Sequence, residues 1–166
     1  METRFAIEES TRCASEYVWA YSVAKQVGEP SPATNYMPEP PVECYEIRAL
    51  GEPVGRGPFG PVHPVLGVAY LVIDKRGRAE LDFLYVYPQY RGRGVAKRLV
   101  EQAIEFARGK GAKTMLCIIF REDVREKLRE RLGLEVDVNP EASRRIAMSL
   151  GFKEIEDDAF VLELGR

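Results

Sequence analysis

The chain has 166 residues, of which 45% are hydrophobic and 30% are charged. These values are typical of one globular domain, here predicted to span residues 1–166, and they exclude a disordered chain. The formal net charge of −2 argues against non-specific nucleic-acid binding, and no apolar run is long enough to span a bilayer. We therefore expect neither a nucleic acid nor a membrane as a partner.

Cysteine and histidine are too few and too widely spaced to indicate a CxxC pair, a metal site or a catalytic triad. Cys13, Cys44 and Cys117 form no CxxC pair, which favours reduced thiols in a cytoplasmic protein. His63 is the only histidine and has no second ligand type nearby, so we expect no metal site. The chain also lacks the GxSxG turn that would accompany a Ser-His-Asp hydrolase site.

The first third of the chain alternates regular elements with loops rich in proline and glycine. Apolar residues between Tyr17 and Ala24 recur at helical spacing, and Gly28 and Pro30 stop that helix. In chain order we predict a short strand at 4–8, a helix at 11–27, a loop at 28–41, a strand at 42–50 and a loop at 51–64.

The rest of the chain predicts strands and helices that build an α+β domain around one mixed central sheet flanked by helices. A turn signal at 74–78 separates two apolar strands, and the strand at 113–120 is apolar on both faces. The predicted elements are strands at 65–73, 79–87, 113–120, 152–155 and 160–164, and helices at 92–108, 123–132 and 139–150.

The turn Gln89-Tyr90-Arg91-Gly92-Arg93-Gly94 joins an apolar strand to an amphipathic helix. Two glycines let the backbone approach a phosphate, and the N–H groups at the helix start then point at it. Arg91 and Arg93 add positive charge at the same place. The turn therefore predicts an anion-binding site, rather than a tight turn with solvated arginines.

Other nucleotide-binding loops fit this chain less well. A dinucleotide fingerprint would need a third glycine near Lys97, and a Walker loop would need Ser or Thr where Arg98 stands. The stretch 55–62 matches the glycine-rich loop of kinases, but none of the other kinase motifs follows it. We expect that stretch to be a mobile or substrate-covering loop.

The segment from Leu84 to Leu99, which contains the turn, resembles the acyl-CoA-binding signature Q/R-x-x-G-x-G/A of the GNAT superfamily of N-acetyltransferases. The likeness extends from about Val65 to Phe120 and returns at Gly151-Phe152. It implies a central sheet that splays open at its middle, between the strands at 79–87 and 113–120.

The resemblance also implies acetyl-CoA as co-substrate, with its pantetheine in that gap. The backbone of Leu84 to Val86 would pair with the pantetheine amides, the N–H groups of 92–97 would bind the pyrophosphate, and a strand N–H would polarise the acetyl carbonyl. The predicted cofactor-binding residues are Leu84, Tyr85, Val86, Gln89, Arg91, Gly92, Arg93, Gly94, Val95, Ala96, Lys97 and Asn139.

Glu80 is the candidate general base, because it resembles a glutamate that some GNAT enzymes carry early in this strand. Strand alternation would place Glu80, Asp82, Leu84 and Val86 on one face. A carboxylate near the gap can take the proton of the amine directly or through a water. The alternative is an ordinary acidic residue at the start of a hairpin strand, which we favour for Asp82.

The sequence departs from the family pattern in its last third. Many members carry a tyrosine four residues before the late glycine, as general acid for the thiolate, where this chain has Ala147. Asn139 stands one residue away from the usual asparagine, and the helix at 123–132 looks like an insertion. Gly133-Leu134 is an alternative match for the Gly-Phe pair, but Gly151 leaves enough chain for two last strands.

The resemblance implies an N-acetyltransferase in which an amine attacks acetyl-CoA directly within a ternary complex. The amine could belong to a small molecule or to a protein or peptide, and a homodimer is compatible with the resemblance. The missing tyrosine motivates an alternative, a non-catalytic acyl-CoA-binding or sensing module on the same fold. A weaker third idea is a protein-interaction domain that uses the helix at 123–132.

Overall fold

A computed structural model of the chain describes residues 3–11, 15, 18, 31–119, 126, 130 and 140–165. The helices predicted at 11–27 and 123–132 lie outside the described residues except for these isolated positions, and Asn139 lies outside them too. That the chain forms one domain over residues 1–166 stays a prediction. No helix among the described residues is long and apolar enough to cross a membrane.

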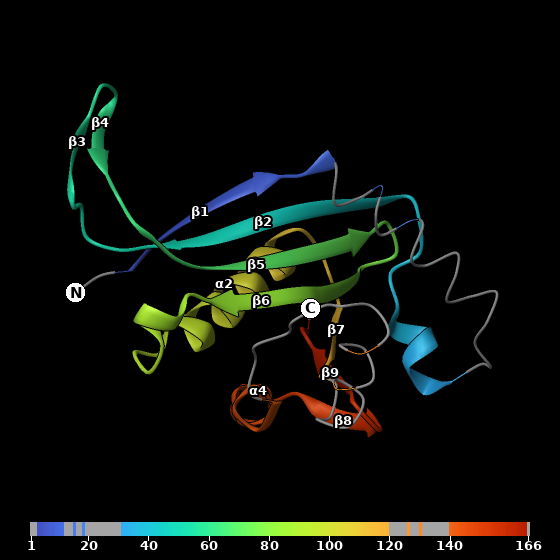
Figure 1. Cartoon of the computed structure of the whole chain (residues 1–166). Helices are drawn as coiled ribbons and strands as arrows, with labels where there is room; N and C mark the ends of the chain where they lie inside the picture. Colours follow the sequence, from blue (N-terminus) through green and yellow to red (C-terminus); the bar gives the residue numbers. More distant parts are fainter. Residues whose placement is uncertain are drawn as a thin grey trace.

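A seven-stranded sheet forms the centre of the fold, with strand order β1-β2-β5-β6-β7-β9-β8 (Figure 1). Neighbouring strands are antiparallel except β6 and β7, which are parallel. The mixed sheet predicted from the sequence is therefore confirmed. The strands are β1 (Arg4–Glu9), β2 (Val42–Leu50), β5 (Val65–Asp74), β6 (Arg78–Val86), β7 (Thr114–Ile118), β8 (Lys153–Glu156) and β9 (Ala159–Glu163).

Both predicted loops contain regular structure. A turn of 3-10 helix spans Pro32–Tyr36 in the first loop. In the second, β3 (Gly55–Gly57) and β4 (Gly60–Val62) pair as a separate hairpin that projects beyond the end of β2 and β5 (Figure 1). The stretch 51–64 was predicted only as a loop, and the hairpin within it was not foreseen, because backbone pairing does not require an apolar strand pattern.

Helix α2 (Val95–Gly109) packs behind β5 and β6 and closes the main core (Figure 1). Its buried side chains recur at helical spacing and form one apolar stripe. Gly67 on β5 permits the close approach, because a Cβ atom there would lie 2.7 Å from the Tyr85 carbonyl oxygen and 3.1 Å from Leu99 Cδ1. The stripe consists of Val95, Leu99, Val100, Ala103, Ile104 and Ala107.

The parallel pairing of β6 with β7 stops halfway along β6. Residues 78–81 pair with 114–117, and Leu81 with Cys117 is the last pair. Within the described residues, strand β6 continues to Val86 alongside β5 alone. The sheet therefore splays at its middle, at the place that the family resemblance implied.

A β-bulge interrupts β6 at Asp82. Tyr70 of β5 pairs with Phe83 and Leu71 pairs with Leu81, which leaves Asp82 as an extra residue in β6. An extra residue reverses the alternation of side chains beyond it. The prediction that Glu80, Asp82, Leu84 and Val86 share one face was therefore wrong: Leu84 and Val86 pack on the core with α2, as Ala79 and Leu81 do.

The two faces of the sheet consequently differ in composition. We call the side covered by α2 the α2 face and the other side the opposite face. Glu80 is on the opposite face, because it alternates with the core residues Ala79 and Leu81 and pairs with Leu116, which belongs to a separate apolar cluster. Phe83 and Tyr85 are also on the opposite face, because they alternate with Leu84 and Val86.

The turn between β5 and β6 is organised by the buried carboxylate of Asp74. Asp74 Oδ1 accepts hydrogen bonds from the main-chain N–H groups of Arg76 and Arg78, both at 2.9 Å. Its Oδ2 accepts from Arg78 Nε at 2.8 Å and from the Glu39 N–H at 3.0 Å. Burial alone would raise the pKa of Asp74, but these hydrogen bonds outweigh burial and lower the pKa below its ordinary value.

Candidate functional site

The glycine turn after β6 forms an irregular entry to α2. A turn of 3-10 helix spans Pro88–Tyr90, and Gly92 and Gly94 both have φ of +78°. A residue with a Cβ atom is strained in that conformation, so the backbone selects glycine at both positions. Helix α2 begins at Val95 and not at the predicted residue 92, because its helical φ values start only after Gly94.

The start of α2 presents main-chain donors without intrahelical partners. The first hydrogen bond of the helix joins the Arg98 N–H to the Gly94 carbonyl oxygen at 3.2 Å. The N–H groups of residues 95–97 precede it and have no acceptor inside the helix. The N-cap residue is Gly94, which has no side chain that could accept a hydrogen bond from them. These donors and the helix dipole make the site suitable for an anion.

The outer half of β6 presents a second set of main-chain groups. The Tyr87 N–H donates to the Leu66 carbonyl oxygen at 3.0 Å, so Tyr87 is turned toward β5. The main-chain groups of Val86 and Leu84 therefore point to the other side, where β7 has already diverged. This edge is available to an extended ligand that carries amide groups.

The side chain of Arg91 connects the glycine turn to the outer edge of β6. Its Nε donates to the Val86 carbonyl oxygen at 2.9 Å, and its guanidinium carbon lies 5.5 Å from the centre of the Tyr85 ring. The guanidinium carbon of Arg93 lies 5.9 Å from the centre of the Tyr90 ring. Both arginines bring positive charge to the turn, as the sequence predicts.

A cleft of about 450 Å³ joins the helix start to the edge of β6. It brings together nine of the twelve predicted cofactor-binding residues; Gln89 and Arg93 are not among its lining residues, and neither is the candidate base Glu80. Asn139 lies outside the described residues. The cleft is lined by Leu84, Tyr85, Val86, Tyr90, Arg91, Gly92, Gly94, Val95, Ala96, Lys97, Ala142, Ser143 and Ile146.

Helix α4 (Pro140–Ser149) supplies lining residues that sequence reasoning missed. Ala142 and Ile146 are four residues apart, so one face of α4 meets the cleft together with Ser143. Helical periodicity could have identified this face, but only the packing of α4 shows that it lies beside β6. Tyr90 was missed as well, although it stands inside the predicted turn.

The charge of the cleft is positive. Arg91 and Lys97 line it, and no acidic side chain does so among the described residues. Within the described residues, no group of three or more His, Cys, Asp or Glu side chains gathers into a metal site. The cleft is therefore suited to an elongated anion with an apolar or amide-containing portion.

Glu80 and Cys117 lie where β6 and β7 begin to diverge. Glu80 is 7% exposed, whereas the nearby Asp82 is exposed. Burial, followed by the charge of Glu80, raises the pKa of the Cys117 thiol to about 12. Cys117 is thus a protonated, unreactive thiol at neutral pH, because only the thiolate is an effective nucleophile.

The end of α4 leads into the last two strands. Gly151 ends the helix with φ of +96°, Phe152 is buried in the main core, and β8 and β9 follow. The two strands predicted after Gly151-Phe152 are therefore present, and Gly133-Leu134 lies outside the described residues. Ala147 is buried in the core and is not among the residues that line the cleft.

Comparisons with known proteins agree with this architecture. A model of the acetyltransferase (GNAT) family matches residues 11–133. An acetyltransferase of the GNAT family from Staphylococcus aureus Mu50 is similar in structure, with a TM-score of 0.50 at 11% identity, covering 97% of this chain and 99% of that chain. The ribosomal-protein-S18-alanine N-acetyltransferase from Escherichia coli is similar with a TM-score of 0.51 at 15% identity, covering 98% and 96%. A search of curated proteins found no match.

Proposed function

The chain belongs to the acetyltransferase (GNAT) family, and from this premise we propose that it transfers an acetyl group from acetyl-CoA to an amine. The observation that carries the proposal is the continuous cleft between the start of α2 and the outer edge of β6, which pairs with no further strand among the described residues. Acetyl-CoA has two parts that match these two surfaces: a diphosphate suits the start of α2, and an extended arm with two amides suits the edge of β6. The reaction is a direct attack of the amine within a ternary complex.

The diphosphate binds at the start of α2. The N–H groups of Val95, Ala96 and Lys97 need acceptors, and phosphate oxygens provide them. The side chain of Lys97 adds a charge, and the absence of carboxylates from the described cleft lining avoids repulsion. This arrangement supports binding without a metal ion.

The pantetheine arm extends along β6. Its amides pair with the outward main-chain groups of Leu84 and Val86, as a further strand would. Ile146 and Ala142 of α4 cover the arm from the other side. The thioester then lies where β6 and β7 diverge, and a main-chain N–H of β6 polarises its carbonyl group.

Glu80 is the proposed base at that point. The neutral amine forms a bond from nitrogen to the acetyl carbon, the carbon–sulfur bond breaks, and CoA leaves as the thiolate. The proton that the amine loses passes to Glu80, directly or through a water, and solvent returns a proton to the thiolate. The burial of Glu80 supports this role, and the high pKa of Cys117 disfavours a covalent acetyl-cysteine intermediate.

One observation favours a second candidate, a non-catalytic acyl-CoA sensor. Ala147 stands where many family members carry the tyrosine that protonates the thiolate, and the residue is only 5% exposed, within the core. A sensor needs only the cleft and not the acid. Such a protein would bind CoA and release none.

Incubation with acetyl-CoA and a broad panel of amines, with detection of the free CoA thiol, tests the proposed function. We expect amine-dependent thiol release together with a rise in melting temperature on addition of CoA. A melting shift without thiol release from any amine would establish the sensor instead. The absence of both signals would rule out both functions.

A further inference from the structure

A continuous row of aromatic side chains lies on the opposite face of the sheet. The ring centres of Tyr70 and Phe83 are 5.5 Å apart, those of Phe83 and Tyr85 are 6.3 Å apart, and those of Tyr85 and Tyr87 are 5.4 Å apart. These distances are typical of favourable ring contacts. We call these four residues the aromatic row. Phe83 is 42% exposed and Tyr87 is 39% exposed, so the row presents ring surface to the outside.

The bulge at Asp82 creates this row. With uninterrupted alternation from Leu81, the side chains of Phe83 and Tyr85 would point to the α2 face. The extra residue turns them to the opposite face and sends Leu84 and Val86 into the core in their place. A strand with the same composition but no bulge would bury its aromatic residues under α2. The exposed row is therefore a consequence of one backbone irregularity.

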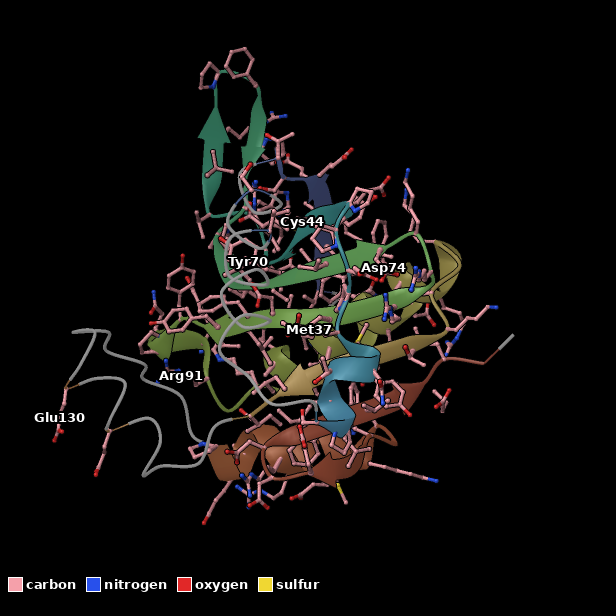
Figure 2. The ribbon with its side chains drawn as sticks, turned by 90° about the vertical axis from the view of Figure 1, so that its right-hand side faces the viewer. Met37, Cys44, Tyr70, Asp74, Arg91 and Glu130 are labelled. Carbon is pink, nitrogen blue, oxygen red and sulfur yellow. The ribbon has the colours of Figure 1, made fainter. Side chains whose placement is uncertain are left out.

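The row begins where the reaction is proposed to occur. Leu81 forms the last pair with β7, and Phe83 follows two residues later on β6. Tyr85 belongs both to the row and to the lining of the cleft. Figure 2 places Tyr70 and Arg91 toward the same end of the sheet, away from Asp74. The aromatic row is thus continuous with the cofactor cleft.

Carboxylates accompany the aromatic row on this part of the sheet. Glu46 pairs with Tyr70 across β2 and β5, and Glu8 pairs with Glu46 across β1 and β2. Arg48 binds both glutamates, at 2.8 Å to Glu8 and 3.3 Å to Glu46, so this group carries a net negative charge. Rings beside carboxylates attract an organic cation, since ring faces carry negative potential.

We propose that the acceptor is a primary amine linked to an aromatic ring by a short alkyl chain. Its ring stacks on Phe83 and its neighbours in the row, and the linker carries the amine back to the divergence of β6 and β7, where Glu80 lies. This inference rests on the proposed function and adds the class of acceptor to it. The reaction is unchanged: the amine takes the acetyl group, and the carbon–sulfur bond breaks.

Other amines lack this match with the row. A linear polyamine could meet the carboxylates Glu8 and Glu46, but it carries no ring to stack on the faces of Phe83 and its neighbours in the row. A straight alkylamine would gain burial but no ring stacking. We expect 2-phenylethylamine to be a better substrate than n-hexylamine or spermidine, with a KM roughly two- to tenfold lower.

The test compares these three amines and a short peptide with a free N-terminus, using the full chain and acetyl-CoA. In the variant Phe83→Ala we expect the KM for 2-phenylethylamine to rise roughly five- to tenfold and the KM for n-hexylamine to rise less, while the KM for acetyl-CoA changes less than about twofold. The variant Phe83→Trp, which keeps a ring, should restore the low KM. Phe59→Ala is the matched control, because Phe59 is fully exposed on the separate β3–β4 hairpin.

Several outcomes would overturn the inference. If hexylamine, spermidine or the peptide is acetylated and 2-phenylethylamine is not, the acceptor class is wrong while the proposed function stands. If Phe83→Ala slows all amines equally, the row supports the sheet rather than the acceptor. If no amine is acetylated although CoA binds, the proposed function fails, and the inference fails with it. Circular dichroism and melting temperature show whether each variant is folded.

Discussion

The two ends of β6 show how one strand serves both stability and binding. At its start, residues 79–81 pair with β5 on one side and residues 78–81 pair with β7 on the other. Asp74 accepts three hydrogen bonds from the adjacent turn and one from the Glu39 N–H. At its other end, Leu84 and Val86 turn their main-chain groups away from β5 toward a side that β7 has left. The bulge at Asp82 separates the two ends.

This difference shows where the chain leaves hydrogen-bonding capacity for a ligand. The first end of β6, which we call the closed end, is saturated by its own neighbours. The second, which we call the open end, presents main-chain donors and acceptors beside the start of α2, where further N–H groups lack intrahelical partners. A strand edge can pair with an extended ligand as it would with a further strand, so an edge that forms one wall of a cleft indicates a ligand-binding surface. The three predictions below test this comparison.

The largest effect is expected at the border between the two ends. Replacing Glu80 with glutamine keeps the shape of the side chain but removes its ability to accept a proton. We expect kcat to fall about a hundredfold, with the KM for acetyl-CoA unchanged and the acidic limb of the pH–rate profile lost. The exposed Glu101→Gln on α2 is the control and should behave as the wild type. An unchanged kcat in Glu80→Gln would assign Glu80 to the closed, structural end.

A smaller effect is expected at the open end, from Gly92→Val. The new side chain strains a backbone with φ of +78°, at a cost of about 2 kcal/mol. We expect the turn to relax in the free variant, so CoA binding must restore the strained conformation and the affinity should fall roughly thirtyfold. Titration of CoA monitored by calorimetry measures this loss. Gly165→Val introduces similar strain at φ of +73° outside the cleft lining and should leave CoA affinity intact. Equal affinities of the two variants would contradict a phosphate site at this turn.

The smallest effect is expected at the closed end, from Asp74→Asn. Losing charge-assisted hydrogen bonds should lower the free energy of unfolding by about 1.5 kcal/mol at pH 7, without changing CoA affinity. Because the folded-state pKa of Asp74 is lowered, its contribution is complete above the ordinary carboxyl pKa of about 3.9 and is lost as pH falls through the lower folded value.

Urea unfolding at pH 7 and pH 3 measures both parts of this prediction. The gap between wild type and Asp74→Asn should narrow at pH 3, because pH 3 lies below the ordinary carboxyl pKa of about 3.9, where the stabilisation from the charge has begun to be lost. Glu154→Gln on β8, where the side chain is exposed, should change stability by less than about 0.5 kcal/mol at either pH. A constant gap would mean that the charge of Asp74 does not stabilise the turn.

Much of the candidate site could be predicted from the sequence, because most of its residues are close together in the chain. The turn from Gln89 to Gly94, the following helix and the preceding strand are neighbours in sequence, and nine residues predicted from them line one cleft. The contribution of α4 could not be read in this way, because Ala142 and Ile146 are more than forty residues away. Their place beside β6 depends on the packing of the chain.

The bulge at Asp82 is the clearest case in which the pattern of a single strand predicted the wrong face for its side chains. Period-two alternation placed Glu80 with Leu84 and Val86, but pairing with β5 skips one residue and reverses every side chain beyond it. Register depends on two strands at once, so one strand's pattern cannot reveal it. The same limit applies to the β3–β4 hairpin, which is defined by cross-strand pairing.

The sequence by itself determined the mixed sheet, the helix α2 and the glycine turn, because hydrophobic periodicity and glycine conformation act over a few neighbouring residues. Only the tertiary structure decided how β6 divides into a closed and an open end, which face carries the aromatic row, and which surface of α4 completes the cleft. Those features arise from contacts between segments far apart in the chain, and their geometry depends on the register and packing of the partner segment.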